Sequence, residues 1–172
     1  MIYAYGLFEP YQSLKGESIV MKAEYINPFI EAFDSVASQV IGEKSEKGKV
    51  FIKEGSVNCG EVTISIGVTG ELNGSILMNM NEKSALTIAS KMMFGMEVTE
   101  LNDLAKSAIA ELGNMIAGNA TIYFSNLGKS IDITPPVVYT GKNISIYNYK
   151  IKTICVPLTI IGELVEIDIA IS

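Results

Sequence analysis

Hydrophobic side chains recur every three or four residues in a segment that follows Met21, which is the period of an amphipathic helix. Asn27 is a good helix-capping residue and Pro28 suits a first helical position, while the pattern stops at Gly42. We therefore expect a helix between Asn27 and Gly42. Its apolar positions are Ile26, Phe29, Ile30, Phe33, Val36, Ala37, Val40 and Ile41.

The period changes to two after this helix, as expected of strands with one buried face. Glu43 to Lys49 is polar and predicts a loop, whereas Val50 to Lys53, Glu61 to Val68 and Ser75 to Met80 predict strands. Two or three antiparallel strands are therefore expected. The apolar residues on one face of the second are Val62, Ile64, Ile66 and Val68.

Two helices and a group of strands complete the pattern. Asn81 begins a predicted helix that ends at Gly95, and another runs from about Leu101 to Tyr123. The C-terminal third predicts the strands Ser130 to Ile133, Ile144 to Tyr149, Ile151 to Val156 and Glu163 to Ile171. This order indicates an α+β domain, with an antiparallel or mixed sheet packed against two long helices.

The first twenty residues follow neither period. Translation from Met21 is one interpretation, and an N-terminal arm that packs its aromatic residues on the body or on a neighbour is the other. We expect an extension over residues 1–20 and one domain over residues 21–172. The extension lacks the basic start and apolar region of a secretory signal, so the expected compartment is the cytoplasm.

Composition narrows the possible chemistry. The 172 residues are 48% hydrophobic and 19% charged, which favours one folded domain. A net charge of -6 without a basic cluster argues against nucleic-acid binding, and no apolar stretch is long enough to span a membrane. The absence of histidine excludes Ser-His and Cys-His catalysis and most zinc sites. Cys59 and Cys155 are expected to be two buried thiols.

The predicted helix over Leu101 to Tyr123 carries two kinds of residue on different arcs. At about 100° per residue, one arc is apolar and is expected to face the sheet. The adjacent arc carries small and polar residues that lie within about 60° of each other. The apolar set is Leu104, Ala108, Leu112, Met115 and Ile116, and the polar set is Ser107, Glu111, Asn114 and Gly118.

Glycines inside this helix predict a close contact, since each costs about 1 kcal/mol relative to alanine. Gly113 and Gly118 are interior, so another backbone or a partner protein is expected to approach closely. We expect the small residues Ala110, Gly113 and Ala117 to stay open for that partner. Packing of the helix on the sheet is the alternative explanation.

Glu111 and Asn114 lie one turn apart, and the two side chains suit a defined task. A carboxylate can hold a cation, and an amide can donate and accept at once and so position a water molecule. A merely solvated helix face is the alternative. The pair has no nucleophile or metal of its own, so any catalysis needs groups from a partner.

The segment from Ser107 to Asn119, with the later Pro135-Pro136, resembles the helix signature of the CheC/CheX/FliY family of chemotaxis phosphatases. That signature has Asp or Ser, three residues, Glu, two residues and Asn, with a proline further on. The likeness covers nearly all of Met21 to Ser172, and a single helix of this kind makes CheX the more similar branch.

The resemblance implies hydrolysis of the aspartyl phosphate of a response regulator such as phospho-CheY. Asn114 would orient the attacking water and Glu111 would pair with a lysine of the partner, with Ser107, Gly118 and Pro136 as supporting or binding positions. It further implies no cofactor of the chain's own, Mg²⁺ on the partner, and a homodimer that joins sheets through strands of the C-terminal third.

Two other functions compete with this one. A noncatalytic binding module of the flagellar switch or signalling apparatus is possible on a related fold. Metal binding through Glu166 and Asp168, on one face of a predicted strand, is the other alternative. Two carboxylates without further ligands are more often a solvated strand face.

Overall fold

The computed structural model describes residues 23–172 and confirms the α+β class. The extension expected over residues 1–20 lies outside the described residues, so its separation from the domain stays a prediction. The elements in chain order are α1 (Ala23–Val40), β1 (Glu46–Lys47), β2 (Phe51–Asn58), β3 (Val62–Gly70), β4 (Gly74–Met80), α2 (Glu82–Met92), α3 (Asp103–Asn126), β5 (Ile131–Ile133), β6 (Val137–Thr140), β7 (Ser145–Ile160) and β8 (Glu163–Ile171).

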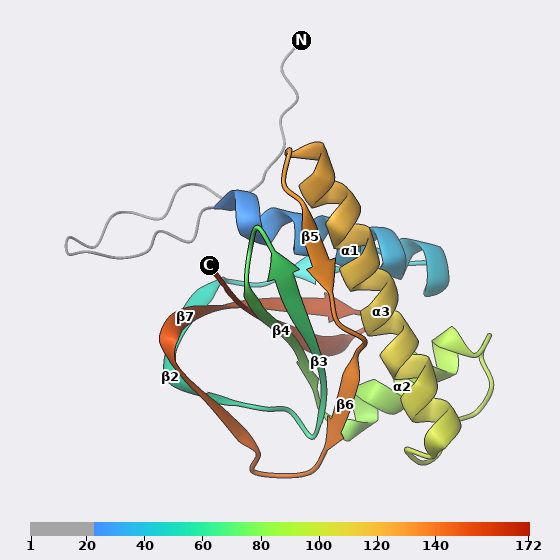
Figure 1. Ribbon diagram of the computed structural model, residues 1–172. Helices are drawn as coiled ribbons and strands as arrows, with labels where there is room; N and C mark the ends of the chain where they lie inside the picture. The colour runs from blue at the N-terminus through green and yellow to red at the C-terminus, as the bar shows by residue number, and fades with distance from the viewer. Residues whose placement is uncertain (1–22) are drawn as a thin grey trace.

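The strands form one bent sheet in the order β1-β7-β8-β4-β3-β5, with β2 also paired to β7 and β6 also paired to β3. Every strand pair of the described residues is antiparallel. Figure 1 shows the two long helices, α1 and α3, crossing on one side of the sheet, with β5 and β6 running beside α3. The expected sheet on two long helices is confirmed.

The core lies between the helices and one face of the sheet. The alternating faces predicted for β3 and β8 are confirmed, because their apolar residues are almost completely buried. Helices α1 and α3 meet there through Phe29 and Phe124, whose ring centroids lie 5.3 Å apart in an edge-to-face arrangement. The buried residues of the two strands are Val62, Ile64, Ile66, Val68, Val165, Ile167, Ile169 and Ile171.

Several predicted boundaries were wrong. Helix α1 begins at Ala23, so Pro28 lies inside it, where it cannot donate the usual backbone hydrogen bond to the preceding turn. The strands expected over Ile144 to Tyr149 and Ile151 to Val156 are one long strand, β7, because β2 pairs along it on both sides of a register shift between Lys53 and Gly55. Strands β1 and β6 are short and were not predicted.

Candidate active site

Helix α3 begins at a well-formed cap, because the Asn102 side chain accepts a hydrogen bond of 2.9 Å from the backbone N–H of Ala105. The predicted apolar arc was placed slightly wrong. Leu112 and Ile116 are buried as expected, but Leu104 is 58% exposed. The residues of α3 that are buried are Ala105, Ile109, Leu112, Gly113, Ile116, Ala117, Ala120 and Phe124.

Gly113 faces the sheet and not a partner. A Cβ atom built there would lie only 2.7 Å from Cγ2 of Ile64, so the glycine lets α3 sit directly on β3. The expected close approach is therefore real, but the expectation that Gly113 and Ala117 stay open is wrong, since both are buried. Ala110 is half-buried.

Ser107, Glu111 and Asn114 all lie on the solvent-facing side of α3, as predicted. Among residues 23–172, no side-chain hydrogen bond or ion pair involves any of these three. Gly118 is half-buried and has open space beside its Cα, so it is not held by packing as Gly113 is. The helix thus presents a carboxylate and an amide, one turn apart, that a partner can reach.

Pro136 is half-buried in the link between β5 and β6, and both of these strands contact α3. The link is tied to β3, because the backbone N–H of Gly67 donates a hydrogen bond of 2.8 Å to Oγ1 of Thr134. Figure 1 shows it running alongside the middle of α3. The structure therefore brings the proline segment and the helix into one region, while the role of Pro136 stays a prediction.

Asp168 belongs to a buried ion pair that sequence reasoning missed. It is 1% exposed, Nζ of Lys53 lies 3.0 Å from its carboxylate and 3.1 Å from Oε2 of Glu166, and Nδ2 of Asn79 donates to it at 2.8 Å. The interpretation of Glu166 and Asp168 as a solvated strand face was therefore wrong for Asp168. Within the described part of the chain, no group of three or more Cys, Asp or Glu side chains is placed to hold a metal ion.

The environment of this pair shifts the pKa values of its members. Burial raises the pKa of Asp168 despite the opposing effect of Lys53. Burial is the largest single effect on Lys53 and acts to lower its pKa, but Asp168, Cys155 and Glu166 together outweigh it, and the pKa of Lys53 is raised. Cys155 is buried and burial raises the pKa of its thiol, whereas Cys59 is only half-buried, contrary to expectation.

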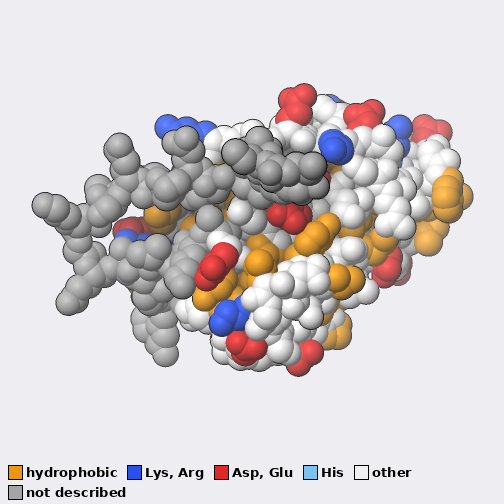
Figure 2. All heavy atoms as spheres, turned by 90° about the horizontal axis from the view of Figure 1, so that it is seen from above, with side chains coloured by type: hydrophobic (Ala, Val, Ile, Leu, Met, Phe, Trp, Pro, Cys, Tyr) orange, Lys and Arg blue, Asp and Glu red, His pale blue; other side chains and the backbone are white. Residues whose placement is uncertain are grey.

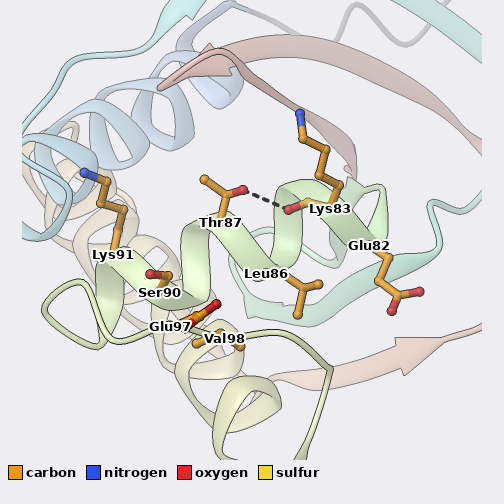
Figure 3. A pocket seen from close by; sticks show the side chains of 8 residues that line it. All are labelled: Glu82, Lys83, Leu86, Thr87, Ser90, Lys91, Glu97 and Val98. Carbon is orange, nitrogen blue, oxygen red and sulfur yellow. Dashed lines mark hydrogen bonds between the residues drawn. The ribbon is translucent and has the colours of Figure 1, made fainter.

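The structure also has a surface hollow away from the candidate pair. This groove runs along α2 and has a volume of about 530 Å³. Figure 3 shows its lining, with Leu86 and Thr87 among charged side chains. Neither Glu111 nor Asn114 lines it, and both residues are exposed on the surface of α3.

The described surface carries charges of both signs. In the face drawn in Figure 2, acidic and basic side chains are interspersed with hydrophobic ones, and the described part of that face shows no concentrated basic patch. Among the described residues no helix has the length and apolar character to cross a membrane.

The fold and the exposed pair define a protein of the CheC-like class. A CheC-like superfamily protein from Shewanella sp. PV-4 has a similar structure, with a TM-score of 0.79, 27% sequence identity, and coverage of 88% of this chain and 99% of that one. The family model described as chemotaxis phosphatase CheX matches residues 62–159. The chain belongs to the CheX family of chemotaxis phosphatases, which confirms the resemblance seen in the sequence.

Two further relatives support this assignment. The CheY-P phosphatase CheX of Thermotoga maritima is 35% identical over 144 residues, which make up 83% of this chain and 92% of that protein. The CheX chain in a solved CheX-CheY-BeF3-Mg²⁺ complex from Borrelia burgdorferi has a TM-score of 0.70 and 34% identity, and the match covers 86% of this chain and 97% of that one.

Proposed function

We propose that this chain hydrolyses the aspartyl phosphate of a CheY-like response regulator, with Glu111 and Asn114 as its catalytic residues. The observation that carries the proposal is the exposure of this pair on α3, a helix held against β3 at Gly113. The similar Thermotoga maritima protein is named a CheY-P phosphatase. The proposed substrate agrees with the cytoplasmic location expected from the sequence.

The chemistry needs a positioned water more than a strong base. Water attacks phosphorus, the bond between phosphorus and the aspartyl oxygen breaks, and the products are inorganic phosphate and a free carboxylate. The Asn114 amide can accept a hydrogen bond from this water and donate one to a phosphoryl oxygen, which holds the water in line with the breaking bond. Such positioning is worth about 10²-fold or more in rate.

Glu111 supplies the negative charge of the pair, and we assign it to a lysine on the regulator. A salt bridge formed as the helix enters the partner's site sets the register of docking. Mg²⁺ is assigned to the regulator, in keeping with the ion in the Borrelia burgdorferi complex. Ser107, Gly118 and Pro136 are proposed to line the contact around the pair.

A homodimer that joins strand edges is the proposed assembly, because it leaves α3 free. Strand β8 lies between β7 and β4, whereas the Ser145–Asn148 stretch of β7 is hydrogen-bonded to β2 alone, so the expected edge in the C-terminal third is open on that part of β7. Strands β2 and β6 each pair with one strand in the described sheet, and both expose apolar side chains, among them Ile52 and Val137. Uncovered apolar edges of this kind invite association.

A noncatalytic binding module remains the second candidate, because related folds need not share a function. The presence of both Glu111 and Asn114 favours catalysis. Phosphate release from a CheY protein phosphorylated by a small acyl phosphate tests the proposal. Faster release with the wild-type chain is expected, and tight binding without faster release would favour the module.

A further inference from the structure

The solvent-facing side of α3 differs from that of α2. Helix α2 exposes charged residues, Glu82, Lys83 and Lys91, as an ordinary solvated helix does. Between residues 104 and 125, Glu111 is the one charged residue among the fully exposed positions of α3, and the partly exposed Lys106 is the other charged residue. The exposed residues there are Leu104, Ser107, Glu111, Asn114, Ile122 and Ser125.

Two large apolar side chains stand on this side, Leu104 at 58% and Ile122 at 59% exposure. They are separated by five full turns at about 3.6 residues per turn, so both point in the same direction. Their midpoint is residue 113, between Glu111 and Asn114 along the helix. Along the helix axis the polar pair is therefore centred between two exposed apolar residues, with Glu111 about 20° and Asn114 about 80° around the helix from the line that joins them.

We propose that Leu104 and Ile122 are the apolar anchors by which α3 docks on the response regulator. The inference rests on the proposed function, because the occupant is the protein whose phosphorylated site receives Glu111 and Asn114. Apolar side chains that become buried in an interface add favourable free energy to that of the polar contacts made by the pair. Anchors on both sides of the pair would fix the tilt of α3 over the phosphoryl group.

The dimensions of a protein interface agree with this assignment. At a rise of about 1.5 Å per residue, Leu104 and Ile122 lie about 27 Å apart, or about 13 Å on either side of the pair. A standard interface buries about 800 Å² on each partner, a patch about 30 Å across. A regulator that covers the Glu111/Asn114 pair with such an interface therefore also covers both anchors.

The test measures KM and kcat for the phosphorylated regulator with Leu104→Ala, Ile122→Ala, the double variant and wild type. Alanine is a better helix former than either residue, so the exposed helix keeps its fold. Each single change is expected to raise KM about fivefold with little change in kcat, and the double change about 25-fold, because effects at distant positions multiply. Leu164→Ala is the matched control, since Leu164 is 48% exposed but lies on β8.

The outcomes separate the docking inference from the proposed function. A wild-type chain that dephosphorylates no regulator contradicts the proposed function and the anchors with it. If the wild-type chain is active and both single variants have a KM within about twofold of the wild-type value, only the inference about the anchors is contradicted. An equal rise in KM for Leu164→Ala, or a rise in KM for only one of the two α3 variants, also contradicts the inference.

Discussion

Gly113 of α3 and Ile64 of β3 are in such close contact that a Cβ atom on the glycine would lie 2.7 Å from Cγ2 of the isoleucine. Ile64 is completely buried, and its Cγ2 is attached to the stiff, branched Cβ, so it cannot easily move away. This contact sets how deeply the helix sits on the sheet. It therefore also sets how far Glu111 and Asn114, on the opposite side, project from the surface.

Alanine at Gly113 should destabilise the protein, while alanine at Gly118 should stabilise it. The expected cost at Gly113 is about 1 to 2 kcal/mol, because overpacking against Ile64 exceeds the gain in helix propensity. A Cβ at Gly118 meets open space, so the gain in helix propensity of up to about 1 kcal/mol is not offset by overpacking. Urea unfolding of both variants measures the free energies, and changes of the same sign would contradict this packing.

Lys53→Met should cost about 3 kcal/mol at pH 7, because it leaves the Asp168 carboxylate buried without its cation. Lys152→Met is the matched control, since Lys152 pairs with Glu54 at 2.8 Å on the exposed surface. That control should have little effect on the free energy of unfolding, because an ion pair between exposed side chains contributes little. Thermal or urea unfolding measures both changes in stability. Equal losses of stability in the two variants would show that the buried pair stabilises the fold no more than the exposed pair does.

The deficit of Lys53→Met should shrink as the pH is lowered toward 4. Burial already raises the pKa of Asp168, and removal of Lys53 takes away an opposing effect. A carboxyl whose pKa is higher in the folded state stabilises the fold most below its ordinary pKa, and that stability is lost as the pH rises through the folded-state pKa. A deficit that is larger at pH 4 than at pH 7 would contradict the assignment.

The sequence was most informative where a local signal marks an element. Helix α2 and strand β8 were predicted closely because capping at Asn81 and the alternation from Glu163 to Ile171 are local signals. The pattern could not show that β7 continues without a break, since that depends on pairing with β2, far away in the chain. The start of α1 was missed because Pro28 is also a common residue at a first helical position.

At the candidate site too, local features were predictable from the sequence and contacts between distant segments were not. Exposure of Ser107, Glu111 and Asn114 was predictable from helical period alone. The partner of Gly113 was not, because only the fold brings Ile64 to it. Asp168 was missed because its cation, Lys53, lies on a strand distant in sequence, although a carboxylate among the alternating apolar residues of β8 was a usable signal.

Glu111→Lys should weaken binding of the regulator about tenfold or more, because it places two positive charges opposite each other. Glu111→Gln keeps the shape of the side chain and should have a smaller effect on binding. Titration calorimetry with CheY carrying beryllofluoride and Mg²⁺ measures both. Equal affinity of the wild type and the lysine variant would show that Glu111 does not face a lysine.

The protein should sediment as a dimer at micromolar concentration, and charge on a strand edge should disrupt the dimer. Ile52→Lys on β2 or Val137→Lys on β6 is expected to shift it toward monomer, because both residues are exposed and apolar. Glu111→Lys, on α3, should leave the dimer intact. A monomeric wild type, or crosslinks that bury Glu111 between subunits, would contradict the proposed assembly.

The central claim is that Asn114 positions the attacking water. Its most direct test is phosphate release from phosphorylated CheY with wild type, Asn114→Ala and, as a matched control, Asn126→Ala at the exposed end of the same helix. The account predicts that Asn114→Ala lowers kcat about 10²-fold or more while folding and regulator binding are retained, and that Asn126→Ala turns over normally. Near-normal turnover by Asn114→Ala would contradict it.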